Sequence, residues 1–248
     1  MYNFTIQTVK NDIIFDFAFH LKEAIKYNNW FYNEKVYDYQ FCENIKNIKT
    51  TNVKSLVPIG SVEFVLDFYK TYFDINNIKP INIPNELNKF KFLKRKIFKG
   101  SEKNSISNST SKQYFIKDIS KIKGFTDIVS FEEIPNNRDV LASEEIEILN
   151  EWRCFIYKGE LLDIRSYNTS CFVYPNIDII KEMINEYKNS PTAYTIDVGI
   201  TDSGETVLIE IHQFFSCGLY GFMDYRVLPN MFIATHKEII KNKRASGF

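Results

Sequence analysis

The sequence predicts an α/β protein that contains more than one small sheet. Strand and helix patterns alternate through its first third, and most of the remainder consists of strand patterns separated by short turns. The chain has 248 residues, of which 44% are hydrophobic and 25% are charged. This composition supplies enough apolar surface for one large domain or two small ones, and it excludes a disordered chain.

The first elements alternate in type. A strand is predicted over residues 3–9, an amphipathic helix over residues 15–27 and a second strand over residues 35–41. A further helix is predicted over residues 62–73, because the hydroxyl group of Ser61 is placed to cap its first turn.

A connector is predicted at residues 79–87, where Pro80 and Pro84 prevent a regular helix. It divides the chain into an N-terminal α/β unit at residues 1–78 and a larger domain at residues 79–248. The larger domain contains a Ser- and Asn-rich tract, residues 101–113, that is predicted to be a loop. Its predicted strands cover residues 114–119, 128–131, 152–157, 160–166, 193–200 and 206–214, and its predicted helix covers residues 177–188.

The charge balance and the cysteines exclude several classes of protein. Lys plus Arg and Asp plus Glu both number 31, so the formal net charge is zero and a nucleic-acid partner is not expected. No apolar run reaches the roughly 18 residues of a membrane span, and Lys10, Asp12 and Asp16 interrupt the N-terminal segment. We therefore expect a cytoplasmic protein with no membrane partner. The 4 cysteines stand far apart, which predicts reduced thiols and no zinc site.

The strongest local signal is a hairpin that brings two carboxylates together. A two-residue turn at Ser203 and Gly204 pairs Asp197 with Glu210. Alternation then places Ile196, Val198, Ile200, Val207, Ile209 and Ile211 on one face, and Thr195, Asp197, Gly199, Leu208, Glu210 and His212 on the other.

Two opposed carboxylates repel each other unless a positive group lies between them. A divalent cation would supply that charge, and two carboxylates with one imidazole suit magnesium or manganese better than zinc. The alternative is an exposed polar face whose carboxylates point into water. The residues alone leave both interpretations open.

A second hairpin carries two arginines. With a three-residue loop at residues 158–160, Arg153 faces Arg165, whereas a two-residue turn places them on opposite faces. Adjacent arginines repel unless they bind an anion such as phosphate. Upstream, residues 89–99 interleave Lys and Arg with apolar residues, which indicates either a solvated face or a local anion site.

Five segments carry a resemblance to a known family. They are VPIGSVEFV at residues 57–65, YFIKD at 114–118, KIKGF at 121–125, EWRCFIYKGELLDIRSY at 151–167 and YTIDVGITDSGETVLIEIHQFFSCGLYG at 194–221. In this order they resemble the ATP-grasp superfamily, in particular a clade named for one signature arginine and two signature lysines, whose members are mostly predicted peptide or amide ligases. The resemblance implies an ATP-grasp fold, with a small N-terminal α/β unit packed on two α+β lobes that grip ATP.

The resemblance also implies which residues bind the nucleotide. Lys117 would contact the α-phosphate and the adenine edge, and Lys123 would reach toward the β- and γ-phosphates. The alternatives are an edge-strand lysine and an ordinary loop lysine. Residues 140–146 resemble the hinge whose backbone pairs with adenine, although a plain acidic loop is equally compatible. The hinge residues expected at the nucleotide are Glu144, Glu145 and Ile146, one of the glutamates being available to the ribose hydroxyls.

The remaining roles concern the phosphate end. Arg153 and Arg165 would face the γ-phosphate and the acyl-phosphate that replaces it, and Arg95 or Lys96 would add a basic contact. Asp197 and Glu210 would hold Mg2+ or Mn2+, with His212 as a third ligand.

Two positions depart from the resembled pattern. Glu210-Ile211-His212 stands where the family usually has Glu-x-Asn, and a histidine favours manganese or a bridging water. The usual glycine-rich loop is reduced to Gly124, so phosphate binding must rely more on lysines than on backbone amides.

These inferences predict an ATP-dependent carboxylate–amine ligase that forms an amide or peptide bond through an acyl-phosphate. Its partners would be small-molecule or peptide carboxylate and amine substrates, and no motif indicates an oligomeric state. The alternative is a nucleotide-binding or regulatory protein of the same fold without turnover. A nucleotidyltransferase is disfavoured because Lys117-Asp118-Ile119 lacks the glycine of a K-x-D-G motif.

Overall fold

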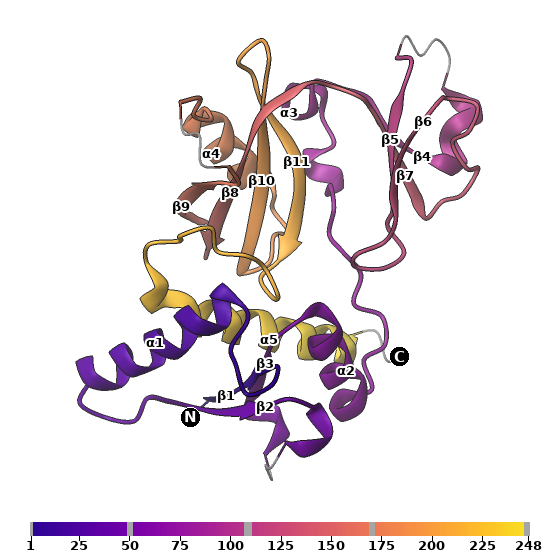
Figure 1. Cartoon of the computed structure of the whole chain (residues 1–248). Helices are drawn as coiled ribbons and strands as arrows, with labels where there is room; N and C mark the ends of the chain where they lie inside the picture. The colour runs from indigo at the N-terminus through magenta and orange to yellow at the C-terminus, as the bar shows by residue number, and fades with distance from the viewer. Residues whose placement is uncertain (1, 49–51, 107–110, 169–171, 246–248) are drawn as a thin grey trace.

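The structure is a computed structural model that describes residues 2–48, 52–106, 111–168 and 172–245. Three sheets organise these residues: a three-stranded sheet near the N-terminus and two four-stranded sheets, which we call the central and the small sheet. Figure 1 shows the N-terminal sheet below the central sheet, with the small sheet standing to one side. None of the helices within these ranges is long and apolar enough to span a lipid bilayer.

The N-terminal sheet is parallel. It consists of β1 (Tyr2–Gln7), β2 (Tyr37–Cys42) and β3 (Leu56–Ile59), in the order β2-β1-β3. The helices that follow β1 and β3 are α1 (Asp16–Phe31) and α2 (Val62–Phe73). The predicted cap of α2 is confirmed, because Ser61 Oγ accepts a hydrogen bond from the amide of Phe64 at 3.1 Å.

The central sheet is antiparallel and carries the predicted metal ligands and both arginines. It consists of β8 (Ile148–Tyr157), β9 (Glu160–Ser166), β10 (Ala193–Thr201) and β11 (Thr206–Gln213), in the order β11-β10-β8-β9. One face packs against α3 (Phe90–Leu93) and α4 (Ile177–Glu186). The buried cluster on that face includes Phe92, Trp152, Met183, Ile196 and Ile211.

The small sheet has a separate core. It consists of β4 (Ile97–Lys99), β5 (Tyr114–Asp118), β6 (Thr126–Val129) and β7 (Val140–Glu144), in the order β4-β7-β5-β6. Its buried residues are Phe98, Tyr114, Ile116, Ile134, Val140 and Ala142. Within the predicted loop at residues 101–113, most of the first part belongs to the 3-10 helix η4 (Gly100–Ser105), and residues 107–110 lie outside the described residues.

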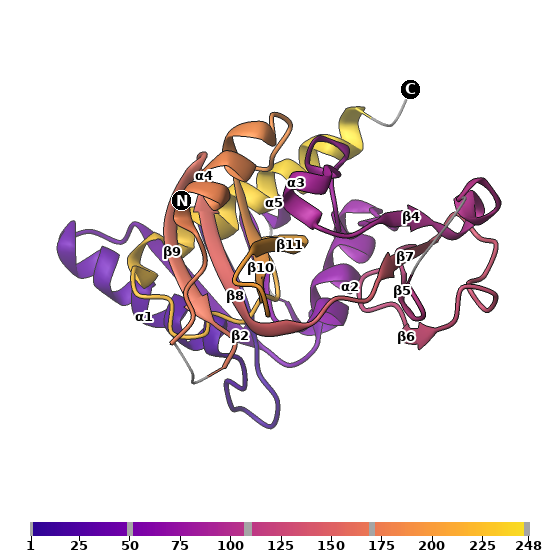
Figure 2. The same ribbon diagram turned by 90° about the horizontal axis from the view of Figure 1, so that it is seen from above.

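The last helix, α5 (Leu228–Ala245), was not predicted from the sequence. Its buried side chains include Leu228, Met231, Phe232, Ile233, Thr235 and His236, most of them at helical spacing. Thr235 and His236 are polar, which hid the amphipathic pattern. Figure 2 shows the helix passing behind the central sheet toward the C-terminus.

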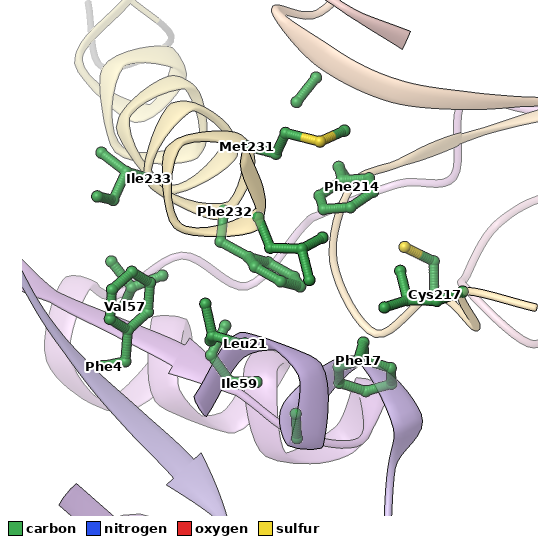
Figure 3. Packing of buried hydrophobic residues seen from close by; sticks show 14 of the residues in the cluster. Phe4, Phe17, Leu21, Val57, Ile59, Phe214, Cys217, Met231, Phe232 and Ile233 are labelled. Carbon is green, nitrogen blue, oxygen red and sulfur yellow. The ribbon is translucent and has the colours of Figure 1, made fainter. Parts of the chain in front are cut away.

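Helix α5 closes the core between the N-terminal unit and the central sheet. Met231 and Phe232 pack in one cluster with Phe4 of β1, Leu21 of α1 and Phe214, which follows β11 (Figure 3). The apolar core therefore combines residues from both sides of the predicted domain boundary near residue 78. The boundary itself stays a prediction.

A buried histidine lies on α5. His236 Nδ1 is 3.0 Å from the hydroxyl oxygen of Tyr69 on α2, and its Nε2 is 3.2 Å from the carbonyl oxygen of Lys54. Burial lowers the pKa of His236 to about 4.

This burial makes stability depend on pH. Because the folded pKa of His236 lies below its unfolded value of about 6.5, its contribution is complete above pH 6.5 and declines as pH falls toward 4. Between pH 7.5 and pH 5 we expect the free energy of unfolding to fall by about 2 kcal/mol more in the wild type than in His236→Gln. Urea denaturation of both proteins measures the difference, and parallel pH profiles would contradict a buried neutral imidazole.

Candidate nucleotide and metal site

The β10–β11 hairpin pairs Asp197 with Glu210, as predicted, although its turn differs from the prediction. Ile200 lies opposite Thr206, and Gly204 adopts a left-handed conformation with φ of 79° in a longer turn. A β-bulge at Ile209 adds one residue to β11 and restores the predicted register beyond it.

Because of the bulge, two residues of β11 lie on the opposite face of the sheet from the one predicted. Leu208, expected on the polar face, is buried in the apolar cluster of the central sheet. Ile209, expected in that apolar wall, instead lines the cavity beside Glu210. A bulge reverses the alternation of side chains on one strand only, which explains both errors.

A second bulge decides between the two predicted arrangements of the arginines. The β8–β9 turn has two residues, Lys158 and Gly159, with φ of 54° and 77°. One extra residue in β9, Leu162, then shifts the register, so that Arg153 lies opposite Arg165. The short turn and the facing arginines are both present.

Arg153 and Asp197 form a buried bidentate ion pair. The distances are 2.9 Å from Nε to Oδ1 and 2.8 Å from Nη2 to Oδ2, and Asp197 is 2% exposed. The hydroxyl of Tyr167 also donates to Asp197 Oδ2 at 2.5 Å. Burial alone would raise the pKa of Asp197, but the hydrogen bonds from Arg153 and His212 hold it below its usual range.

Asp197, Glu210 and His212 form a compact cluster in which one candidate ligand atom of each lies within 4.8 Å of the others. His212 Nε2 is 3.0 Å from Glu210 Oε1 and 3.3 Å from Asp197 Oδ2. On the other side of Glu210, Lys117 Nζ contacts Oε2. Burial alone would lower the pKa of His212, but its hydrogen bonds to the two carboxylates raise the pKa to about 9. Arg153, Lys117 and a protonated His212 therefore surround the carboxylates of Asp197 and Glu210 with positive charge.

A cavity of about 440 Å³ lies between the small and central sheets and meets this cluster at Glu210, the one residue of the three that lines it. Its wall on the small sheet includes Lys117 and Leu141. Among the predicted nucleotide-binding residues, those that line it are Arg95, Lys117, Glu144, Glu145 and Ile146. The remaining apolar lining includes Ile97, Phe115, Ile128, Ile148 and Ile209.

Arg95 is buried and joins the two sheets at this cavity. Its Nε donates to Ser143 Oγ on β7 at 2.7 Å, and its Nη1 donates to the carbonyl of Leu208 on β11 at 3.0 Å. No described carboxylate forms an ion pair with Arg95, and burial lowers its pKa to about 10. The cavity is therefore lined by a buried cation that lacks a counter-charge among the described residues.

Two predicted site residues lie apart from the carboxylate cluster. Lys123 Nζ is 3.5 Å from Glu63 Oε1 on α2, and both side chains are mostly exposed. Arg165 Nε donates to Asp163 Oδ2 at 2.9 Å, and its side chain is partly exposed. Neither residue contacts Asp197, Glu210 or His212.

A family model matches residues 92–229, and it describes the ATP-grasp domain of family 2 in the clade named for one arginine and two lysines. The chain belongs to this family. The matched range includes the small sheet, the central sheet and the whole carboxylate cluster, which confirms the resemblance seen in the sequence.

Solved ATP-grasp structures share the fold of this chain. The ATP-grasp ligase PsnB complexed with a minimal precursor has a TM-score of 0.55 at 9% identity, covering 95% of this chain and 99% of PsnB. D-cycloserine synthetase DcsG has a TM-score of 0.54 at 9% identity, with coverages of 96% and 99%. D-alanine–D-alanine ligase from Bacillus anthracis has a TM-score of 0.52 at 12% identity, with coverages of 98% and 99%. The predicted ATP-grasp fold is confirmed. A search of the curated proteins gives no match.

Sequence reasoning missed two residues of this ATP-grasp site. Tyr167 bridges Arg153 and Asp197, and the resemblance implied no role for this tyrosine. Glu151 lines the cavity, and burial, followed by the charges of Asp197 and Glu210, raises its pKa. Its position two residues before Arg153 on β8 was the available signal, because alternate strand residues share a face.

The buried ion pair gives a prediction about stability. Asp197→Asn leaves Arg153 buried without its counter-charge, so the free energy of unfolding should fall by about 3 kcal/mol. Glu210→Gln is the matched control, because its partners Lys117 and His212 are closer to solvent and its loss should cost less than about 1 kcal/mol. Urea denaturation at pH 7 with a chelator present measures both variants. Equal losses would show that Asp197 is no more important for folding than Glu210.

Proposed function

We propose that this protein is an ATP-dependent carboxylate–amine ligase that forms an amide or peptide bond through an acyl-phosphate. The observation that carries the proposal is the position of Lys117, which lines the cavity and also contacts Glu210 of the carboxylate cluster. One lysine thus joins a space suited to a nucleotide with a group of ligands suited to a divalent cation.

The cavity suits ATP along its length. In the hinge at residues 144–146, the amides of Glu144 and Glu145 already donate to the carbonyls of Lys96 and Gln113, so the amide of Ile146 would be the hinge donor to adenine. Phe115, Ile128 and Ile209 supply apolar surface for the ring. Arg95 and Lys117 would contact the phosphates beyond the ribose, since both are cationic and line the same cavity. One oxygen of Glu144 already accepts a hydrogen bond from the amide of Lys96 at 2.8 Å, so Glu145 and Glu151 are the better acceptors for the ribose hydroxyls.

The carboxylate cluster suits Mg2+ or Mn2+. Asp197 and Glu210 offer oxygen atoms and His212 offers Nε2, a donor set in which the histidine favours manganese. These three residues would hold the cation, and His212 would have to release its proton to bind. When bound, the cation neutralises charge on the phosphates and on the transferred phosphoryl group.

The reaction would proceed in two displacements. A substrate carboxylate attacks the γ-phosphorus, the bond to the bridging oxygen breaks, and ADP leaves. An amine then attacks the acyl carbon, loses a proton, and releases inorganic phosphate as the amide forms. Repulsion between anions opposes the first step, and positive side chains lower that barrier.

The two arginines and Lys123 would stabilise these phosphates. Arg165 uses Nε for Asp163 and remains partly exposed, so its other nitrogens can reach an anion. Arg153 is held in place by Asp197 and presents a fixed positive charge at the same end of the sheet. Lys123 would have to exchange Glu63 for a phosphate.

The substrates would be small-molecule or peptide carboxylates and amines, and we place the reaction in the cytoplasm. Among the structures of this fold, PsnB is complexed with a minimal precursor and the macrocyclase MdnC, with a TM-score of 0.52, with its precursor peptide. These complexes favour including peptides among the substrates to be tested.

The alternative is a nucleotide-binding or regulatory protein that retains the fold without turnover. One observation favours it: a protonated His212 already supplies positive charge between the two carboxylates. A protein in this state would bind ATP without transferring its phosphate.

Oxygen transfer from the carboxylate tests the ligase proposal directly. The protein is incubated with ATP, Mg2+ or Mn2+, and a pool of amino acids and short peptides whose carboxylates carry 18O. An acyl-phosphate leaves one 18O atom in the released phosphate, so labelled phosphate together with ADP supports the ligase. Glu210→Gln should abolish the labelled phosphate, because it removes a ligand but preserves the size of the side chain. ATP binding without labelled phosphate supports the alternative.

Nucleotide affinity provides a second prediction. Lys117→Ala should weaken binding of a non-hydrolysable ATP analogue about 10- to 100-fold, because a charge-assisted contact of roughly 1.5 to 3 kcal/mol is lost. Calorimetry measures the affinity, and Lys112→Ala, an exposed lysine of the same lobe, is the control. An unchanged affinity in Lys117→Ala would show that Lys117 serves only to neutralise Glu210.

A further inference from the structure

The loop between β5 and β6, residues 119–125, contacts the N-terminal unit through an apolar side chain at its tip. Ile122 is half-buried and packs against an apolar cluster centred on α2. That cluster includes Phe64, Val65, Phe68 and Tyr69 of α2 and Phe215, which follows β11. In Figure 1 the lower end of the small sheet, where this loop lies, points toward α2.

The loop is closely packed within itself. The amide of Asp118 donates to the carbonyl of Phe125 at 2.9 Å, and the amide of Ser120 donates to Asp118 Oδ1 at 2.8 Å. A Cβ atom at Gly124 would lie 2.4 Å from the carbonyl oxygen of Asp118, so the chain can close only with glycine there. Because the ends are joined in this way, holding the tip at Ile122 also fixes the position of the adjacent Lys123.

The loop contacts α2 through an ion pair as well as through Ile122, and the ion pair is the weaker contact. Lys123 and Glu63 are 3.5 Å apart and mostly exposed, so solvent screens their attraction. A triphosphate carries more charge than one carboxylate and can displace Glu63 from Lys123. The apolar contact of Ile122 does not depend on that exchange and can persist when the nucleotide is bound.

The start of α2 is also joined to the segment that follows the carboxylate cluster. Ser216 Oγ, four residues after His212, donates to the carbonyl of Gly60 at 2.7 Å. Phe215 shares the apolar cluster that receives Ile122. Helix α2 therefore contacts both the loop of the small sheet and the end of β11.

We propose that Ile122 is a positioning residue for the phosphate end of the site. Its contact with α2 holds the β5–β6 loop closed, directs Lys123 toward the β- and γ-phosphates, and limits the access of water to the acyl-phosphate. Water attack on that intermediate returns the carboxylate and releases phosphate, so ATP is consumed without an amide. The role of Lys123 in this inference rests on the proposed function, whereas the contact between the loop and α2 does not.

Limited proteolysis tests the contact without any turnover. Cleavage by trypsin after Lys121 and Lys123 should become faster when the loop leaves α2, because a detached loop is more mobile. Ile122→Ser should accelerate cleavage at these sites about five- to tenfold, the effect of losing a half-buried aliphatic side chain. The matched control is Phe125→Ser, which removes an exposed ring from the same loop. Equal cleavage rates in Ile122→Ser and the wild type would overturn the proposal.

Binding and kinetics test the positioning role. In Ile122→Ser, the Kd for a non-hydrolysable ATP analogue and the KM for ATP should rise about five- to tenfold, and the ratio of phosphate released to amide formed should increase. The conservative variant Ile122→Val and the control Phe125→Ser should both keep the wild-type Kd, KM and product ratio. Faster cleavage with unchanged Kd would overturn the positioning role. If the wild type binds ATP without turnover, the ligase proposal fails, while the proteolysis and the Kd still decide whether Ile122 positions the loop.

Discussion

The buried ion pair between Arg153 and Asp197 is the interaction on which the rest of the site depends. Neither charge could lie in the central sheet alone, because an unpaired buried ion costs several kcal/mol. The guanidinium group is further enclosed by the rings of Tyr167 and Tyr220, whose centroids lie 5.1 and 5.3 Å from its central carbon. The pair therefore fixes one carboxylate before any ligand binds, and Glu210 and His212 are arranged around it.

In this arrangement Asp197 contributes mainly to stability, whereas Glu210 is the carboxylate that can exchange its partners for a ligand. Asp197 is paired with the buried Arg153, whereas Glu210 lines the cavity and its partners, Lys117 and His212, are more exposed. A ligand entering the cavity can replace contacts of Glu210 at lower cost than contacts of Asp197. Stability and ligand exchange are thus assigned to different residues on adjacent strands.

The polar pairs of the central sheet could be predicted from the sequence, but the faces of some neighbours could not. Alternation places Asp197 opposite Glu210 and offers Arg153 opposite Arg165, and both pairings are present. Each hairpin also contains a β-bulge that offsets its turn, and for this reason Leu208 was assigned to the wrong face. The position of a β-bulge depends on how both faces of the sheet pack, and that packing cannot be predicted from the local sequence.

The positions of the cations that are not buried were the hardest to predict. Lys123 and Arg165 each contact a nearby carboxylate, Glu63 and Asp163, since a flexible charged side chain pairs with whatever opposite charge lies within reach. Buried Arg95 illustrates the opposite case, because its hydrogen bonds to Ser143 and Leu208 fix it at the cavity. The family resemblance supplied the residue types, but it did not show that Arg95 already lines the cavity whereas Lys123 does not.

Because α5 packs against the N-terminal sheet, the core of that sheet can be completed only late in synthesis. The core around Phe4 and Leu21 is completed by Met231 and Phe232, which leave the ribosome more than 200 residues later. Domains usually fold as units during synthesis, N-terminal ones first, but here the first strand must wait for the last helix. Until then helix α1 covers only part of its apolar face, so the nascent chain should depend on chaperones for longer than a protein whose early residues form a self-contained core.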